Sequence, residues 1–257
     1  MLTLSIAIQK GGSGKTTTAV NLAAALQQTA GKKVLLVDLD PQANLTQALG
    51  LTEEPDQSIY QLFRKEAMGE EAVLRDIIVA TEAGLDLVPS SLDLAQAELE
   101  LVSIYGREKL LSRMLEGVSG DYDYAFIDCP PAIGMLTVNG LVASQQVLMP
   151  LQAEFLPLKG VKSFMRTFER IQKQLNPQLE ILGFVLTKYD QRKNMNRQVL
   201  DQLMSDYGSK VFETRIRTNI ALAQAQEKGL DIFHHKPNSH GAQDYMALAS
   251  EFLAKTR

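Results

Sequence analysis

The strongest constraint on the fold of this chain is a glycine-rich segment between two apolar stretches. Residues 10–17 read Lys-Gly-Gly-Ser-Gly-Lys-Thr-Thr, residues 2–8 before them are mostly apolar, and residues 16–28 are rich in alanine and leucine at helical spacing. Glycines allow a loop to turn its backbone N–H groups toward phosphate oxygens, and the start of a helix adds partial positive charge there. The segment therefore predicts a strand, a phosphate-binding loop and a helix in succession.

The residues of this loop have separate expected tasks. Lys15 is expected to reach the β- and γ-phosphates of a nucleoside triphosphate, and the Thr16 hydroxyl is expected to ligate Mg²⁺. The alternative is a glycine-rich turn that only joins strand to helix, and the Gly-Lys-Thr ending disfavours it. We expect phosphate contacts from Gly11, Gly12, Ser13, Gly14, Lys15, Thr16 and Thr17.

Short apolar runs alternate with helical patterns along the rest of the chain. We expect strands at residues 2–8, 33–38, 85–88, 124–128, 146–150 and 181–187, and helices at residues 16–28, 93–116, 159–175, 194–207 and 242–255. This alternation predicts an α/β fold, with a mostly parallel twisted sheet and helices on both faces, of the P-loop NTPase type. A single domain covering residues 1–257 is the simplest organisation, with ligands bound at the carboxyl ends of the strands.

Composition limits the cellular setting and the classes of partner. Cys129 is the only cysteine, so a disulfide framework within one chain is impossible and a reducing, cytoplasmic setting is expected. The sequence contains no signal-peptide pattern and no apolar run near the ~18–20 residues that span a bilayer. The net charge is −4, yet residues 159–217 hold twelve Lys/Arg against six Asp/Glu. A basic face on this part of the chain remains compatible with a nucleic-acid partner.

Three motifs resemble those of one family of ATPases. The loop has Gln9 where an ordinary P-loop has glycine and begins with a second lysine, so it resembles the deviant P-loop of the ParA/MinD superfamily. Residues 37–44, Val-Asp-Leu-Asp-Pro-Gln-Ala-Asn, resemble the Asp-x-Asp-Pro-Gln-x-Asn segment of ParA/Soj partition proteins, and residues 126–131, Phe-Ile-Asp-Cys-Pro-Pro, resemble their Walker B segment. The motifs occur in the family's order, and the resemblance covers almost the whole chain.

The carboxylates of these motifs suggest a metal site and a site that positions water. Asp128 ends an apolar strand, and with a P-loop present we expect it to bind Mg²⁺, through water. Asp38 and Asp40 point the same way if the strand geometry persists. The resemblance places Asp38 near Mg²⁺ with Thr16, and it makes Asp40 the residue that positions the attacking water. A turn-forming Asp-Pro is the alternative for Asp40.

The resemblance implies ATP and Mg²⁺ as cofactors, and it implies catalytic roles for both loop lysines as well as for Asp40. Lys15 would stabilise the transferred phosphoryl group. Lys10 would cross a dimer interface to the nucleotide of the partner subunit, in the manner of an arginine finger. A local surface lysine is the alternative for Lys10. The expected assembly is a homodimer that forms with ATP.

The resemblance also implies non-specific DNA binding through basic residues in two regions. The first region contains Arg192, Lys193 and Arg197; Arg192 matches the family pattern well. The second contains Arg215 and Arg217, where the family often has Pro-Arg-Asn and this chain reads Arg-Thr-Asn. A solvated basic surface is the alternative. Only nine residues precede the loop, so an operator-binding domain at the N-terminus is not expected.

The expected function is a slow ATPase that dimerises with ATP, binds DNA and segregates or positions a plasmid, chromosome or other cargo. A ParB-like or other adaptor protein would stimulate it, and it would be cytoplasmic and nucleoid-associated. One alternative is a MinD-like membrane regulator. It is disfavoured because the terminal helix has few basic residues, so we expect Tyr245, Leu248 and Phe252 to pack on the domain. The other is a nucleotide-dependent metabolic enzyme on the same scaffold.

Three minor patterns in the sequence do not change this expectation. A redox role like that of the nitrogenase iron protein needs two cluster-ligating cysteines, and the chain has one. Residues 187–190, Thr-Lys-Tyr-Asp, resemble a guanine-binding motif over only four residues, so ATP is expected rather than GTP. His234, His235 and His240 lie close in sequence, but a loop explains them better than a metal site.

Overall fold

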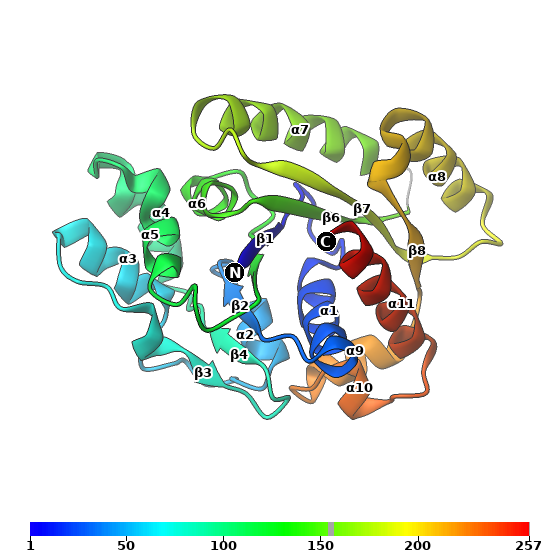
Figure 1. The fold of residues 1–257 in the computed structure, drawn as a ribbon, viewed down its shortest axis with the longest axis horizontal. Coiled ribbons are helices and arrows are strands. Elements are labelled where there is room, and N and C mark those ends of the chain that lie inside the picture. The colour runs from blue at the N-terminus through cyan, green and yellow to red at the C-terminus, as the bar shows by residue number, and fades with distance from the viewer. Residues whose placement is uncertain (154–156, 257) are drawn as a thin grey trace.

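The structure, a computed structural model, describes residues 1–153 and 157–256. Strands and helices alternate over most of this length (Figure 1). The strands are β1 (Leu2–Ile6), β2 (Val34–Asp38), β3 (Val79–Ala80), β4 (Asp86–Val88), β5 (Tyr124–Asp128), β6 (Gln146–Gln152), β7 (Glu180–Tyr189) and β8 (Val211–Arg217). The helices are α1 (Lys15–Ala30), α2 (Asn44–Ala48), α3 (Ile59–Met68), α4 (Leu94–Glu100), α5 (Leu110–Glu116), α6 (Met135–Ala143), α7 (Pro157–Gln174), α8 (Asn194–Tyr207), α9 (Ile220–Glu227), α10 (Ile232–His235) and α11 (His240–Lys255).

Within the described residues the strands form one eight-stranded sheet in the order β3-β4-β2-β5-β1-β6-β7-β8. Every pairing is parallel except that of β3 with β4. Strand β1, which leads into the glycine-rich loop, therefore lies between β5 and β6. The predicted fold class is confirmed: a mostly parallel sheet with helices on both faces.

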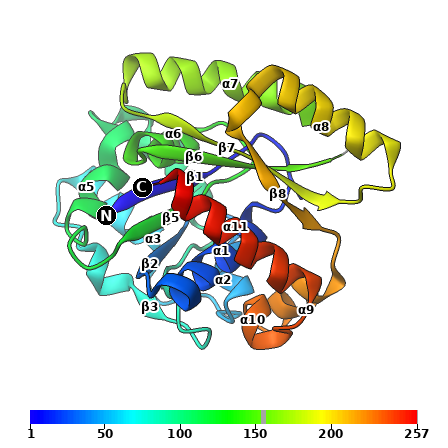
Figure 2. The same cartoon turned by 45° about the vertical axis from the view of Figure 1, so that its right-hand side comes forward.

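Side chains of the central strands alternate between two separate cores. In β2, Val34 and Leu36 pack on one face of the sheet, with α1, α9, α10 and α11, whereas Leu35 and Val37 pack on the other, with α3 to α8. Figures 1 and 2 show these two layers, with α7 and α8 on one side and α1 and α11 on the other. Because both faces are covered, the strands carry continuous apolar sequence.

One sequence-based expectation is corrected, and one edge strand was missed. The single helix expected at residues 93–116 is wrong: α4 gives way to a 3₁₀ turn at Leu101–Ser103, and α5 starts only after Gly106, which has a φ of 69°. A residue in the left-handed region breaks the repeating dihedral angles of an α-helix, so one continuous helix cannot run through Gly106. Strand β8 was not predicted, because it is an edge strand whose exposed Glu213 and Arg217 interrupt its apolar pattern.

The terminal helix α11 packs against the sheet. Tyr245, Leu248 and Phe252 are buried as expected, and the Phe252 ring meets the Phe126 ring of β5 edge to face at 5.7 Å between centroids. In the described part of the chain, no helix has both the length and the apolar character needed to span a membrane. The apolar side of α11 is therefore used for packing on the domain.

Candidate functional site

The glycine-rich loop joins β1 to α1 at the carboxyl edge of the sheet. Gly12 and Gly14 have φ values of 70° and 90°, a region that other residues rarely adopt. A Cβ added at Gly12 would meet no atom within 4 Å, so the concave side of the loop is open. The Thr187 hydroxyl of β7 donates to the Ser13 carbonyl at 2.8 Å, which fixes the loop against β7, two strands away from β1 in the sheet. Left-handed glycines in a loop that opens a helix are the features expected of a phosphate-binding loop.

A cavity of about 1010 Å³ lies over this loop. Its walls come from the loop, from the segment after β2, and from the end of β8 with the start of α9. The seven residues expected to contact phosphate all line it. The third wall, which includes Thr218 and Asn219, was not predicted from the sequence. The Asn219 side chain caps α9 by accepting from the Ala221 N–H. The cavity is large enough for a nucleotide.

The helix start and the end of β5 meet in one polar contact. The Thr16 hydroxyl donates to Asp128 Oδ2 at 2.6 Å, while the buried Oδ1 of Asp128 has no hydrogen-bond partner among the described residues. Burial raises the pKa of Asp128 to about 7, and the nearby Lys15 partly offsets this. A hydroxyl beside an unpartnered carboxylate oxygen is a donor set that suits Mg²⁺. Thr16 and Asp128 therefore fit the expected metal role.

Asp38 lies beside Asp128 in the sheet, but its oxygens are turned to its own loop. Oδ1 accepts from the Asp40 N–H at 3.1 Å, and Oδ2 accepts from the Thr46 N–H and hydroxyl at 2.8 and 2.7 Å. Burial, followed by repulsion from Asp128, raises the pKa of Asp38 to about 8. These bonds organise the loop between β2 and α2. A direct metal contact by Asp38 stays a prediction.

Two of the three predicted catalytic residues, Asp40 and Lys15, line the loop cavity, and Lys10 does not. Asp40 lines the cavity, and its Oδ1 accepts from the Gln42 N–H at 3.0 Å, which orients the carboxylate. Lys15 lines the cavity and is buried, with its ammonium 3.5 Å from the carbonyl of Lys10. Lys10, half-buried, starts the loop. The structure thus brings the predicted nucleotide-site residues to one edge of the sheet.

The raised pKa values make the stability of the nucleotide-free protein depend on pH. Unfolding returns Asp38 and Asp128 to a pKa near 3.8, so between about pH 4 and 8 the folded state holds protons that the unfolded state has lost. The free energy of unfolding is therefore expected to fall as pH rises through this window, with a slope of up to about 1.4 kcal/mol per pH unit for each group. Thermal melting without metal from pH 5 to 8.5 measures it. A flat profile would contradict the expectation; added Mg²⁺ is expected to flatten it.

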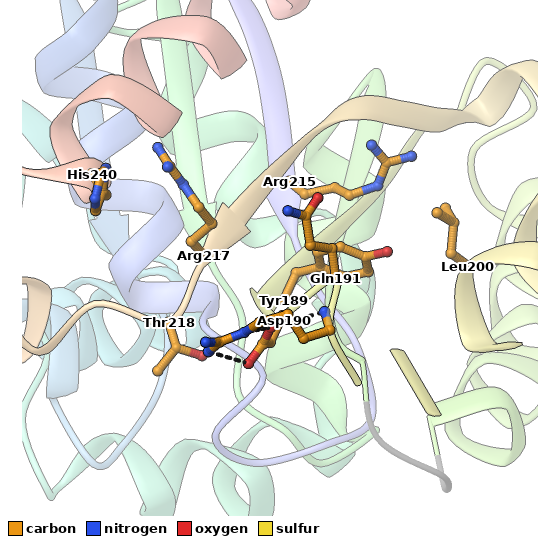
Figure 3. Close-up of a pocket in the computed structure, with 9 residues that line it drawn as sticks. Tyr189, Asp190, Gln191, Leu200, Arg215, Arg217, Thr218 and His240 are labelled. Atoms are coloured by element: carbon orange, nitrogen blue, oxygen red, sulfur yellow. Dashed lines mark hydrogen bonds and ion pairs between the residues drawn. The ribbon is translucent and has the colours of Figure 1, made fainter. Parts of the chain in front are cut away.

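The predicted DNA-binding residues lie after β7 and at the end of β8, at the same edge of the sheet. Arg192, Arg215 and Arg217 line a second cavity of about 660 Å³, with Arg217 also lining the first. Figure 3 shows Arg215 and Arg217 projecting from β8 around it. Lys193 and Arg197, exposed at the start of α8, do not line it. The structure groups three of the five arginines and lysines around one hollow.

Each arginine of this second cavity already has a contact. Arg192 pairs with Asp190 through two hydrogen bonds of 3.0 Å, and Arg217 pairs with Asp244 at 2.6 Å. The Arg215 guanidinium lies over the Tyr189 ring at 5.5 Å, and its Nε is buried with no hydrogen-bond partner among the described residues. Arg192 remains largely exposed despite its pairing, so it is accessible to a phosphate group.

The histidines near the C-terminus do not assemble a metal site. The Asp231 side chain caps the short helix α10, the His234 ring pairs with the same carboxylate, and His240 begins α11. Among the described residues no group of three or more His, Cys, Asp or Glu side chains is arranged to hold a metal ion.

The chain matches several known proteins over nearly the whole length of both sequences. The family model described as an AAA domain matches residues 1–181. Sporulation initiation inhibitor protein Soj of Bacillus subtilis is 43% identical over 98% of both chains, and chromosome partitioning protein ParA of Caulobacter vibrioides is 41% identical over 99% of this chain and 94% of its own. Chromosome-partitioning ATPase Soj of Treponema pallidum is 42% identical over 98% of this chain and 97% of its own.

Solved structures share the fold as well. Cobyrinic acid a,c-diamide synthase of Mycobacterium smegmatis with bound ADP and magnesium superposes with a TM-score of 0.83 at 38% identity, covering 98% of this chain and 94% of its own. McdA of Cyanothece superposes with a TM-score of 0.86 at 25% identity, covering 98% and 99%. With these relatives and the loop geometry together, this chain belongs to the ParA/Soj family of partition ATPases.

Proposed function

We propose that this ATPase dimerises when ATP is bound, holds DNA without sequence preference in that state, and positions a chromosome, plasmid or other cargo. The observation that carries the proposal is the pair of cavities that share Arg217 and Thr218. One cavity would hold the nucleotide, and the other is lined by arginines. A conformational change at the nucleotide cavity can therefore alter the arginine-lined cavity through the side chains that line both. In the cell the DNA-holding state would place the protein on the nucleoid.

The residues of the first cavity have complementary tasks. The loop N–H groups and Lys15 would hold the phosphates of ATP, and Thr16 with Asp128 would hold Mg²⁺. The bound Mg²⁺·ATP supplies the cleavable phosphoanhydride bond, and the metal neutralises part of its charge. Asp40, oriented by the Gln42 N–H, would position the attacking water. Phosphoryl transfer depends on such positioning and charge stabilisation more than on covalent chemistry.

DNA binding is supported by the local charge and its placement. The arginine-lined cavity lies at the carboxyl edge, beside the nucleotide site, so both belong to one end of the molecule. Lysines and arginines bind DNA by neutralising backbone phosphates, and such binding weakens as salt rises. An adaptor protein that stimulates hydrolysis would end the DNA-bound state. No membrane partner is proposed.

The test is DNA retention by the wild-type protein and by Asp40→Ala, with ATP·Mg²⁺ and with ADP, at two salt concentrations. We expect retention with ATP only, longer retention by Asp40→Ala because hydrolysis is slowed, and weaker retention at high salt. Arg192→Ala is expected to reduce the salt slope by about one unit. Arg113→Ala is the matched control, because Arg113 pairs with Glu66 at a distance from both cavities.

Two results would count against the proposal. Equal retention with ATP and ADP would remove the nucleotide switch. Loss of retention in Arg113→Ala to the same extent as in Arg192→Ala would remove the assigned surface. If the wild-type protein binds no DNA and turns over ATP only with a small-molecule acceptor, the result would favour a nucleotide-dependent metabolic enzyme. The similarity to a structure named as a cobyrinic acid diamide synthase makes a corrinoid acid the first acceptor to try.

A further inference from the structure

A charged pair joins the end of β8 to α11. Arg217, the last residue of β8, lines both the nucleotide cavity and the arginine-lined cavity. Its Nε and Nη2 donate to Asp244 Oδ1 at 3.0 and 2.6 Å, and its backbone N–H donates to Asp244 Oδ2 at 2.9 Å. Figure 3 shows the Arg217 side chain extending from β8 toward α11. Asp244 therefore holds both the side chain and the backbone at the end of β8.

The Asp244 carboxylate is well shielded from water. The Asp244 side chain is 10% exposed, whereas the Arg217 side chain is 44% exposed. Hydrogen bonds between a guanidinium and a carboxylate are stronger than neutral ones, and the fork of the guanidinium fixes the orientation of both groups. A shielded carboxylate that loses such a partner keeps an uncompensated charge. The pair is therefore a firm contact, and it leaves little of the Arg217 charge free for a DNA phosphate.

The third wall of the nucleotide cavity follows Arg217 directly. Thr218 and Asn219 line the cavity, and Asn219 Oδ1 accepts from the Ala221 N–H at 2.9 Å, which caps α9. The backbone of these residues can move only with the end of β8, to which it is bonded. The position of Arg217 therefore sets where α9 begins and how wide the cavity is.

The first turn of α11 packs closely against the same wall. A Cβ added at Gly241 would lie 3.0 Å from Leu222 Cγ and 3.3 Å from Asn219 Nδ2, closer than most Cβ atoms approach a neighbour. Leu222 also lines the nucleotide cavity. The start of α11 and the third wall are thus in direct contact, and a displacement of one would displace the other.

The next residue of α11 is fastened to the helix that follows the phosphate loop. Tyr245 is buried and lines the nucleotide cavity, and its hydroxyl lies 3.2 Å from the Thr18 hydroxyl of α1. The Thr18 N–H donates to the Gly14 carbonyl of the loop at 2.9 Å. Successive residues of a helix point about 100° apart, so Asp244 and Tyr245 reach different neighbours. Through these two residues α11 links the phosphate loop to the third wall.

Glu251 makes a similar contact farther back along β8. Its Oε1 accepts from the Glu213 N–H at 2.8 Å, and its Oε2 accepts from the Thr214 N–H at 2.9 Å. Glu251 follows Asp244 by seven residues, about two helical turns, so both carboxylates project from the same side of α11. Among the described residues that line the two cavities, Glu251 and the two residues it holds are absent. Glu251 therefore supports the same strand without supporting the cavity.

We propose that Asp244 is a positioning residue for nucleotide binding: by holding Arg217, it keeps the third wall at the distance from the phosphate loop at which ATP fits. Asp244 itself need not touch the nucleotide. The proposal rests on the proposed function only in its assignment of the nucleotide cavity, and it does not require the DNA-bound state.

The test is steady-state ATP hydrolysis together with the Kd of a fluorescent ATP analogue. For Asp244→Asn, whose amide cannot neutralise Arg217, we expect KM and Kd to rise at least about fivefold and kcat to stay within about twofold of wild type, because ground-state and transition-state binding are lost equally. Arg217→Ala is expected to behave alike. The double variant is expected to bind no worse than Arg217→Ala, since Asp244 acts through Arg217.

Glu251→Gln is the matched control for a structural effect. It removes the charge of a carboxylate that holds the same strand, so we expect its melting temperature to fall about as much as that of Asp244→Asn. Its KM and Kd are expected to equal those of wild type. A split between stability and nucleotide binding would separate a positioning residue from a residue that only stabilises β8.

Gly241→Ala tests the third wall without changing a charge. Its methyl group would press on Leu222 and Asn219 while the pair between Arg217 and Asp244 stays in place, so we expect KM and Kd to rise here as well. Gly120→Ala is the matched control, because Gly120 is exposed and a Cβ added there would meet no atom within 4 Å.

Three results would overturn the proposal: KM and Kd of Asp244→Asn that are unchanged or lower, a fall in its kcat as large as the rise in KM, or an equal rise in KM for Glu251→Gln. These measurements contain no DNA, so they are separate from the test of the proposed function. If the wild-type protein retains no DNA, the DNA-bound state proposed above fails, while the KM of Asp244→Asn still decides the role of Asp244.

Discussion

Lys10→Ala is expected to bind ATP with nearly wild-type affinity and to hydrolyse it about 10³–10⁵-fold more slowly, the range known for residues that supply a positive charge across an interface. Lys10 starts the loop and is half-buried, while its carbonyl accepts from the ammonium of Lys15. The backbone carbonyl survives the substitution, so the loop and the position of Lys15 are expected to persist. Only the charge that would act on a partner subunit's nucleotide is lost.

The measurement is kcat together with the affinity for a fluorescent ATP analogue. A second experiment mixes the Asp40→Ala protein with the Lys10→Ala protein. We expect the mixture to recover some ATP turnover. In a mixed dimer, the Lys10→Ala subunit keeps its own Asp40, and the Asp40→Ala subunit supplies Lys10 to that site. Lys32→Ala is the control, since Lys32 pairs with Asp123 on the far edge of the sheet. Normal turnover by Lys10→Ala would remove the trans-acting role.

Asp128→Asn is expected to lower kcat with Mg²⁺ by about 10²–10³-fold, the effect of removing one preorganised charge-stabilising group. The same change is expected to stabilise the protein at pH 8 in the absence of nucleotide and metal. Burial raises the pKa of Asp128 to about 7, so above that pH the folded state carries a buried charge with one unpartnered oxygen. The amide carries no charge, and its oxygen still accepts from Thr16.

The prediction is specific because aspartate-to-asparagine substitutions at two positions are expected to change the melting temperature in opposite directions. Hydrogen bonds from the Lys33 N–H and from Lys32 lower the pKa of Asp123, so its ionised form favours folding, and this contribution disappears as pH falls through that pKa. Melting temperatures at pH 8 should therefore rise for Asp128→Asn and fall slightly for the exposed Asp123→Asn. A decrease for both variants would show that the unpartnered carboxylate at β5 does not destabilise the nucleotide-free protein.

The sequence predicted the sheet and the phosphate loop because both depend on local patterns. Strands such as β2 and β5 are buried on both faces, so their apolar character is continuous and easily read. The P-loop needs glycines in fixed positions and a helix directly after it. Both features can be recognised without knowing which distant parts of the chain lie beside them.

What the sequence did not reveal depends on distant contacts. The hydrogen bond from the Ser90 hydroxyl to the Asp40 carbonyl can be seen only when β4 lies beside β2, because the two residues are fifty positions apart in sequence. Glu98 reads as one more charge on a helix until α6 is placed against it. The third wall of the nucleotide cavity comes from β8, an edge strand whose polar residues hide its pattern.

The strand order also sets when this protein can fold during synthesis. Strand β1, which leads into the nucleotide loop, pairs only with β5 and β6, whose residues follow it by more than a hundred positions. Contacts so distant in sequence form slowly and leave strand edges exposed in the meantime. The nascent loop therefore has no supporting sheet until about half of the chain has been translated, and truncated products that end before β5 are expected to aggregate and not to bind nucleotide.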